Sequence, residues 1–471
     1  MNTSIDLQSR LDEYFQLHQS EFIDTISRLI AVRSVNEPAK PGMPFGEGPA
    51  KALALALEIA GEMGFSTRNY DNYVGTADLN GNETKLAILS HLDVVDEGTG
   101  WSTPPYQPVV KDGMIYGRGS SDDKGPSVAA IFAMKAVKEL GIPLKYNTRL
   151  ILGTDEELGS SDIAYYFKQE SAPPYTFSPD GNFPVLNTEK GHFQPYLSKT
   201  WQGSAALPRV LNIQAGVQVN VIPAQVQATL EGFSQAEVQP YCEKAAAQTG
   251  TTFELTQDGS QLTLTVHGKN GHGAAPQKAN NALTALIEIL ASLPLAASES
   301  ASLIHAFHAF FPHGDFYGNA LGIAQSEEIT GPLTLSFNML SMNETGMKAR
   351  FDSRTPLCAT QENSIQIVLD KLSAAGIEVK NHVLPPHHTP ADSAFVQTLL
   401  RIYEQYTGQP GYCESTGGGT YVHEIEGGVC FGANMPGFEP GAHSPDEHAS
   451  IADLITAAKI YAQAIMELCS G

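Results

Sequence analysis

Two short runs of apolar residues are each followed closely by acidic side chains, and this arrangement limits the folds open to the chain. Residues 86–89 precede His91 and Asp93, and residues 150–152 precede an Asp-Glu-Glu triplet at 155–157. A continuous apolar run of this length is typical of a strand buried on both faces. Between the runs, residues 126–140 show helical periodicity, with Pro at the start and Gly after the end. Strand–helix–strand alternation of this kind predicts an α/β sheet.

The spacing of apolar residues changes along the chain, and the helical spacing of the first part returns near the end. Helices are expected near 19–31 and 48–63 in the first part, and long amphipathic helices at about 395–406 and 451–468 in the last. The middle differs, because strands with one solvated face alternate there with helices. Its strands are expected at 262–266, 333–339 and 347–353, and its helices at 280–293 and 361–375. Residues 1–190 and 383–471 are therefore predicted to form one discontinuous domain, and residues 191–382 an inserted α+β domain.

Charge and cysteine usage restrict the partners and the compartment. The 471 residues include 28 basic and 51 acidic side chains, a formal net charge of −23. This excess argues against nucleic acid or an anionic membrane as a partner. No stretch approaches the ~18 apolar residues of a membrane span, and the first residues show no export signal. Five scattered cysteines without a CxxC pair fit a reducing compartment. A cytoplasmic location is expected.

Further acids and histidines follow other strand ends or glycine-rich turns. Asp122 and Asp123 precede the helix at 126–140, Asp180 lies in Ser-Pro-Asp-Gly, and His443 lies in Gly-Ala-His-Ser-Pro. Taken singly, each has an ordinary explanation as a loop histidine, a turn residue or an acid at a helix N-terminus. Ligands of open α/β sheets bind beyond the carboxyl ends of strands. The joint occurrence of these residues therefore indicates one site.

The side chains at these positions suit a pair of divalent metal ions. Two histidines and three carboxylates make a nitrogen and oxygen donor set that fits zinc: His91, Asp122, Glu157, Asp180 and His443. Two dications and a bridging hydroxide would balance the three carboxylates, whereas a single ion would leave anionic charge uncompensated in a cleft. Glu156 then remains free as a general base, and Asp93 is placed to orient the ring of His91.

Five segments occur in the order of a known family: SHLDVV, GRGSSDDKGP, GTDEELGS, SPDG and GAHSPDE. They resemble the co-catalytic dinuclear zinc metallopeptidases related to carboxypeptidase G, aminoacylase and carnosine dipeptidase, and within them the peptidase V-type dipeptidases. The resemblance implies a zinc-exopeptidase-like catalytic domain with a mixed, mostly parallel sheet flanked by helices, plus an inserted α+β lid domain. It also implies a cis peptide between Asp122 and Asp123. The implied ligand sets are His91, Asp122 and Asp180 on one metal and Asp122, Glu157 and His443 on the other, with Glu156 as base.

The inserted domain extends the resemblance. The segment GKNGHGAAP resembles the lid loop of the family, which implies oxyanion stabilisation by His272. Asn220 matches a substrate-contacting asparagine. Arg354 matches an arginine that holds the substrate carboxylate, with Arg350 as the competing candidate because the wording FDSRTP departs from the usual pattern. The segment STGGGTY resembles a glycine loop at the substrate C-terminus, whose backbone N–H groups, at Gly418 and Gly419, form an anion cradle.

The resemblance implies a metal-dependent dipeptidase that acts on short peptides with a free C-terminal carboxylate, through a hydroxide bridging two Zn²⁺ ions. Mn²⁺ or Co²⁺ would suit the same ligands. The alternative is a deacylase of N-acyl amino acids with the same metal site. A non-catalytic binding protein would lack Glu156 or a ligand, and none is missing. No GxSxG, HExxH, GxxxxGK[ST] or GxGxxG motif occurs. The enlarged lid implies a monomer.

Overall fold

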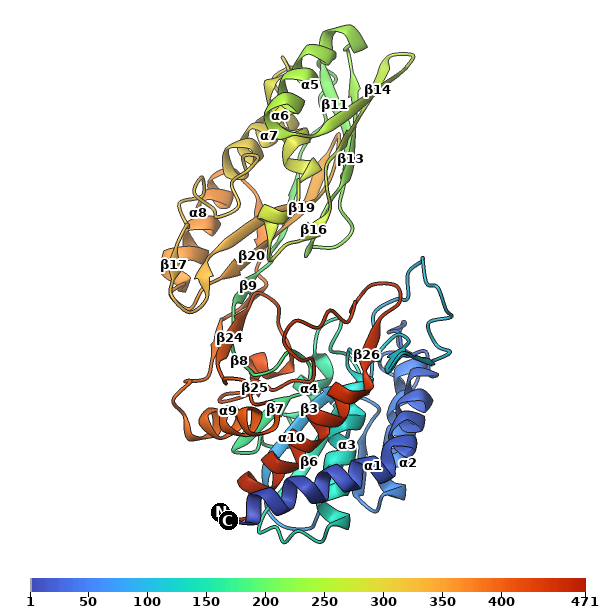
Figure 1. Cartoon of the computed structure of the whole chain (residues 1–471). Helices are drawn as coiled ribbons and strands as arrows, with labels where there is room; N and C mark the ends of the chain where they lie inside the picture. Colours follow the sequence, from blue (N-terminus) through green and yellow to red (C-terminus); the bar gives the residue numbers. More distant parts are fainter. Residues whose placement is uncertain (1) are drawn as a thin grey trace. The chain divides into compact units, whose positions relative to one another are not determined.

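The computed structural model describes residues 2–471, and the chain divides into two compact units (Figure 1). The first unit comprises Met1–Thr188, His388–Ser415 and Gly419–Gly471. The second unit comprises Glu189–His387 together with Thr416–Gly418. The short return of residues 416–418 to the second unit has no counterpart in the sequence-based division, because nothing in its composition distinguishes it from the glycine loop around it.

A nine-stranded mixed sheet forms the centre of the first unit. Its middle is parallel: β3 (Thr84–His91) pairs in parallel with β6 (Asn147–Gly153) and β7 (Tyr175–Ser178), and β7 pairs in parallel with β25 (Val429–Cys430). Leu86, Ile88, Leu150 and Leu152 are fully buried, as the continuous apolar runs predict. The outer strands are β1 (Ser66–Tyr70), β2 (Val74–Asp78), β8 (Val185–Glu189), β23 (His387–His388) and β24 (Cys413–Thr416).

Helices pack around this sheet and share its apolar core. The central one is α3 (Lys124–Glu139), which is buried over most of its length and contacts α1 (Asn2–Ile30) and α10 (Ile451–Cys469) (Figure 1). The helix expected at 19–31 begins much earlier, because Leu11, Tyr14 and Phe15 extend the same buried stripe. The remaining long helices are α2 (Glu47–Glu62) and α9 (Ala394–Thr407). Among the described residues, no helix is both long and apolar enough to cross a membrane.

The second unit is an α+β layer with one ten-stranded antiparallel sheet. Its helices share a core with one face of the sheet, and the alternation in β13 (Gln225–Glu231) buries Val226, Ala228 and Leu230 against them. Two helices, α5 (Gln235–Thr249) and α7 (Glu299–Phe310), had not been predicted. The other main elements are β11 (Arg209–Ala215), β14 (Thr252–Asp258), β15 (Gln261–His267), α6 (Ala282–Ser292), β19 (Thr334–Asn343), β20 (Gly346–Thr355) and α8 (Gln366–Ala374). The α/β class with an inserted α+β domain is confirmed.

Candidate active site

The parallel strands bring the predicted residues of the first unit to one edge of the sheet. His91 is the last residue of β3, Glu156 and Glu157 follow β6, and Asp180 follows β7. Because neighbouring parallel strands end at the same edge, these side chains converge. Among the described residues, two groups have possible ligand atoms within 4.8 Å of one another. They are His91, Asp122 and Asp180, and Asp122, Glu157 and His443.

Asp122 belongs to both groups and joins them through its two carboxylate oxygens. Oδ1 lies 3.0 Å from Nε2 of His91, and Oδ2 lies 3.0 Å from Nε2 of His443. The same His91 nitrogen is 3.7 Å from Oδ2 of Asp180, and the His443 nitrogen is 3.2 Å from Oε2 of Glu157. One carboxylate thus faces two histidine–carboxylate pairs, which is the arrangement that two ions with one shared ligand require.

Asp93 ties the His91 strand end to the Glu156–Glu157 turn. The backbone oxygen of Asp93 accepts a hydrogen bond from Nδ1 of His91 at 3.0 Å, which turns Nε2 toward Asp122. Its carboxylate is completely buried and accepts the backbone N–H groups of Glu156 and Glu157, both at 3.1 Å. Asp93 therefore fixes the imidazole through its main chain and the two glutamates through its side chain.

Glu447 holds the loop that carries Asp122, and no role was predicted for it. Its fully buried carboxylate accepts the backbone N–H groups of Gly119, Ser121 and Asp122 at 2.9–3.1 Å. Nη1 of Arg118 donates to the same carboxylate at 2.8 Å. The sequence signal was its place at the end of the GAHSPDE segment, four residues after His443. The expected cis peptide between Asp122 and Asp123 is present.

Two further residues, to which the sequence analysis assigned no role, support the same edge. Tyr421 packs the edge of its ring against His91, with ring centroids 6.2 Å apart, and its hydroxyl donates to Asp162. Asp162 also accepts the N–H of Asp155 at 3.0 Å, at the end of β6. A Cβ at Gly153 would meet the Tyr421 hydroxyl oxygen at 2.0 Å, so this close approach requires glycine.

His443 reaches the site from an exposed loop in an unusual backbone conformation. Its φ is 59°, in the left-handed region, and its side chain is 56% exposed. A left-handed residue with a Cβ costs on the order of 1–2 kcal/mol. Such a conformation persists where the surrounding structure imposes it, and outliers of this kind cluster at functional sites.

The clustered carboxylates perturb one another strongly. Burial and the charge of Asp122 raise the pKa of Asp180 to about 7. Burial and the charge of Asp180 raise the pKa of Glu156 well above its ordinary value, and burial also raises the pKa of Glu157. Burial opposes ionisation of Asp122 as well, but hydrogen bonds from His443 and His91 lower its pKa. The site therefore favours added positive charge.

One unsatisfied atom agrees with the donor set. Oε1 of Glu157 is buried and has no hydrogen-bond partner among the described residues. A buried carboxylate oxygen without a partner carries a desolvation penalty. A dication at the Asp122–Glu157–His443 group would relieve it, and imidazole and carboxylate are suitable ligands for zinc-like ions. The residues present therefore fit the metal pair.

The second unit places two of its predicted residues together. Val221 pairs with His272 in the ladder of β12 (Val221–Ile222) and β16 (Gly271–His272), and the Asn220 carbonyl accepts the N–H of Gly273 at 2.7 Å. The N–H of Ala274 donates to Nδ1 of His272 at 3.1 Å, which leaves the proton of the neutral ring on Nε2. The structure defines this two-stranded β12–β16 ladder within its own unit, separately from the carboxylate cluster.

The two candidate arginines differ in their contacts. Arg354 is 3% exposed and pairs with both carboxylate oxygens of Asp352, at 2.9 and 3.0 Å. Its Nη1 also donates to the carbonyl of Gly417 at 2.7 Å, next to Gly418. Arg350 stacks on the ring of Tyr196, 3.9 Å from the ring centroid. Arg354 is thus the one in contact with the glycine loop.

The sequence matches the model of the peptidase family M20/M25/M40 over residues 87–467, and the chain belongs to this family. The family expected from the five motifs is confirmed. The Beta-Ala-Xaa dipeptidase of Lactobacillus delbrueckii subsp. lactis is 34% identical over 465 residues, covering 97% of each chain. The putative dipeptidase YtjP of Bacillus subtilis is 33% identical over 459 residues, covering 96% of this chain and 97% of that one. Human carnosine dipeptidase 1 has the same fold, with a TM-score of 0.58 at 17% identity and 98% coverage of both chains.

We predict that Glu447→Gln destabilises the protein. The substitution leaves Arg118 buried without its counter-charge and turns an amide toward backbone N–H donors. Removing one partner of a buried pair of this kind costs about 3 kcal/mol of unfolding free energy. Urea denaturation measures the loss. Glu439→Gln, an exposed acid eight residues earlier, is the control and should change stability by less than about 0.5 kcal/mol. Equal stability of the two variants would refute the assigned role.

Proposed function

We propose that this protein is a metal-dependent dipeptidase that hydrolyses the peptide bond of dipeptides with a free C-terminal carboxylate. The observation that carries the proposal is Asp122, whose two oxygens face two histidine–carboxylate pairs. Membership of a peptidase family supplies the reaction class. The relatives named as dipeptidases match this chain over nearly its whole length, which favours short peptides as substrates.

The proposed resident ions are two Zn²⁺, for which Mn²⁺ or Co²⁺ could substitute. Their ligands would be His91, Asp122 and Asp180 for one ion, and Asp122, Glu157 and His443 for the other. When bound, such a pair supplies Lewis-acid polarisation of the scissile carbonyl and a water of lowered pKa.

Glu156 is proposed as the group that moves protons. Its backbone N–H is fixed on Asp93 while its side chain stays free of the two ligand groups. Burial and the charge of Asp180 raise the pKa of Glu156 well above its ordinary value, which makes its carboxylate a stronger base than an exposed one. Glu156 would take the proton of the attacking water and then donate it to the leaving amine.

Residues of the second unit are proposed to bind the substrate. Nε2–H of His272 would donate to the developing oxyanion, and Asn220, beside the same β12–β16 ladder, would contact the substrate. The carboxylate would lie at the backbone N–H groups of Gly418 and Gly419, where it would take over the N–H of Gly418 from Oγ1 of Thr416, 3.0 Å away. Arg354, bound to the Gly417 carbonyl, would hold this loop and add positive charge to the same end of the substrate.

A monomeric state is proposed because the second unit is larger than one small dimerisation domain requires. Sedimentation showing an obligate, active dimer would contradict it. A cytoplasmic location is proposed because the five cysteines are scattered along the sequence without a CxxC pair, which fits a reducing compartment.

We predict that Glu156→Gln abolishes turnover while both metals stay bound. Removing a general base lowers the rate by about 10²–10⁴-fold, whereas the ligand atoms of the two groups are untouched. Dipeptide hydrolysis and metal analysis of the same sample provide the two readouts. Glu58→Gln, on the exposed face of α2, is the control and should leave both unchanged. Loss of metal together with activity would make Glu156 a ligand and not a base.

Substrate recognition can be tested with matched compounds. A dipeptide should exceed both its C-terminal amide and the corresponding N-acetyl amino acid in kcat/KM by at least about tenfold. For the amide, this is the effect of losing one charge-assisted hydrogen bond of the carboxylate, about 1.5 kcal/mol, whereas the N-acetyl compound keeps the carboxylate and lacks the α-amino group. The panel should include β-alanyl dipeptides, the substrates in the name of one relative. Faster hydrolysis of the N-acetyl compound would favour the alternative, a deacylase of N-acyl amino acids.

Metal binding should strengthen as the pH rises through neutrality. The Asp180 carboxyl, whose pKa is raised to about 7 in the metal-free protein, must lose its proton to bind a cation. The His443 ring must also lose a proton, and its hydrogen bond with Asp122 raises its pKa to about 11. Competition titrations with a chelator measure the affinity. In Asp180→Asn the slope of log affinity against pH below about 7 should fall by about one proton. An unchanged slope would contradict the assignment.

A further inference from the structure

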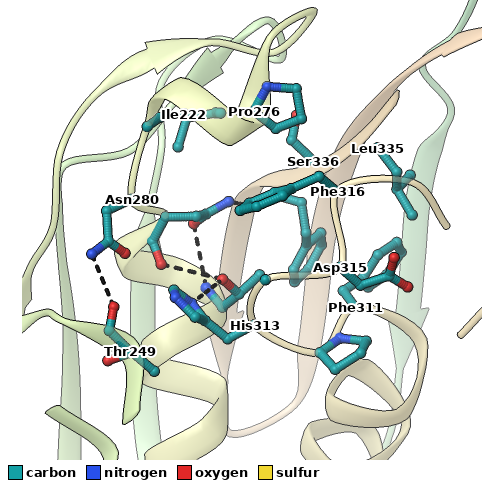
Figure 2. Close-up of a pocket in the computed structure, with 16 residues that line it drawn as sticks. Ile222, Thr249, Pro276, Asn280, Phe311, His313, Asp315, Phe316, Leu335 and Ser336 are labelled. Atoms are coloured by element: carbon teal, nitrogen blue, oxygen red, sulfur yellow. Dashed lines mark hydrogen bonds between the residues drawn. The ribbon is translucent and has the colours of Figure 1, made fainter. Parts of the chain in front are cut away.

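A cavity of about 200 Å³ lies within the second unit, between α6 and the segment that follows His272 (Figure 2). Its walls are partly apolar and partly polar. Ile222 of β12, Pro276 and Leu335 line it, together with the rings of Phe311 and Phe316. These apolar groups offer the body of an organic molecule a surface to pack against, and the polar groups offer it hydrogen-bond partners.

The polar groups at the cavity are uncharged or already satisfied. Burial lowers the pKa of His313, and its Nδ1 is 2.9 Å from the hydroxyl of Thr284. Asp315 is ionised, but its carboxylate accepts N–H groups of its own loop, including that of Ala320 at 2.8 Å. A carboxylate at the wall disfavours an anionic occupant.

One acceptor in the cavity has no partner. Nδ2 of Asn280 donates to the carbonyl of Thr249 at 3.0 Å, as the dashed line in Figure 2 marks. Oδ1 of the same side chain is buried without a hydrogen-bond partner among the described residues. A buried acceptor left unpaired is unfavourable, and a ligand that donates to it removes the penalty.

We propose that this cavity binds an uncharged, ring-sized molecule that donates one N–H or O–H to Oδ1 of Asn280. An engineered apolar cavity of about 150 Å³ holds benzene, so a cavity of about 200 Å³ has room for a single ring with a small donor group. The occupant class is therefore that of neutral phenols and N–H heterocycles.

The occupant would also contact the β12–β16 ladder, which includes His272 and directly follows Asn220. Ile222 pairs with Gly271 in the β12–β16 ladder, and Pro276 begins the helical turn that follows it. An occupant that packs against Ile222 and Pro276 would stabilise this ladder. Its relevance to catalysis rests on the proposed roles of Asn220 and His272, whereas binding itself does not.

The test measures, by calorimetry, the binding of phenol, anisole and benzoate to the metal-loaded protein. Phenol should bind saturably at one site, anisole about fivefold more weakly because it has no donor, and benzoate not measurably. Ser336→Leu fills the cavity and should weaken phenol at least tenfold, whereas Ser341→Leu, exposed on the same strand, should not. Phenol should also slow hydrogen exchange at the amides of Gly273 and Ala275.

Several results would overturn the proposal. They are no saturable phenol binding, equal affinity for phenol and anisole, tight binding of benzoate, or unchanged phenol affinity in Ser336→Leu. The comparison of phenol with anisole on the unaltered protein stands even if that variant does not fold. Because none of these readouts requires dipeptide turnover, failure here is distinguishable from failure of the proposed dipeptidase activity.

Discussion

The arrangement of the site depends on Asp122, whose two carboxylate oxygens each lie 3.0 Å from a histidine nitrogen. His91 comes from the central strand β3 and His443 from a loop near the end of the chain. Their hydrogen bonds to Asp122 lower its pKa despite burial, so it remains anionic. A single ionised side chain thereby connects segments more than 300 residues apart.

The chain fixes Asp122 at some energetic cost. Glu447 is fully buried, and its carboxylate accepts the backbone N–H groups of Gly119, Ser121 and Asp122. Asp93 fixes the turn that carries Glu156 and Glu157, because its carboxylate accepts the backbone N–H groups of both. This framework concentrates anionic side chains whose pKa values rise through burial. The pair of dications proposed here would convert that unfavourable cluster into a stable one.

Local patterns in the sequence predicted the parts of the fold that depend on local physics. The apolar runs before His91 and Asp155 became fully buried parallel strands, and Pro126 lies in the first turn of α3, as its position indicated. Convergence of His91, Asp122, Glu157, Asp180 and His443 was expected from the shared edge of those strands, and these five are the residues whose ligand atoms meet. The cis peptide at Asp122 came from the family resemblance alone.

The sequence did not predict the role of Glu447, the helix α5 or which of two arginines contacts the glycine loop. Glu447 lies 325 residues from the Asp122 N–H that it accepts, so no periodicity could reveal its role. Helix α5 has few buried residues and an internal proline, which hid it from a search for an apolar stripe. Arg350 and Arg354 could not be separated by spacing, since both project from β20, but only Arg354 contacts the Gly417 carbonyl.

Anomalous X-ray scattering from crystals grown with zinc would test the central claim most directly. Two ions per chain are expected, with Asp122 bound to both, His91 and Asp180 on one, and Glu157 and His443 on the other. A single ion, or two ions that share a ligand other than Asp122, would contradict it.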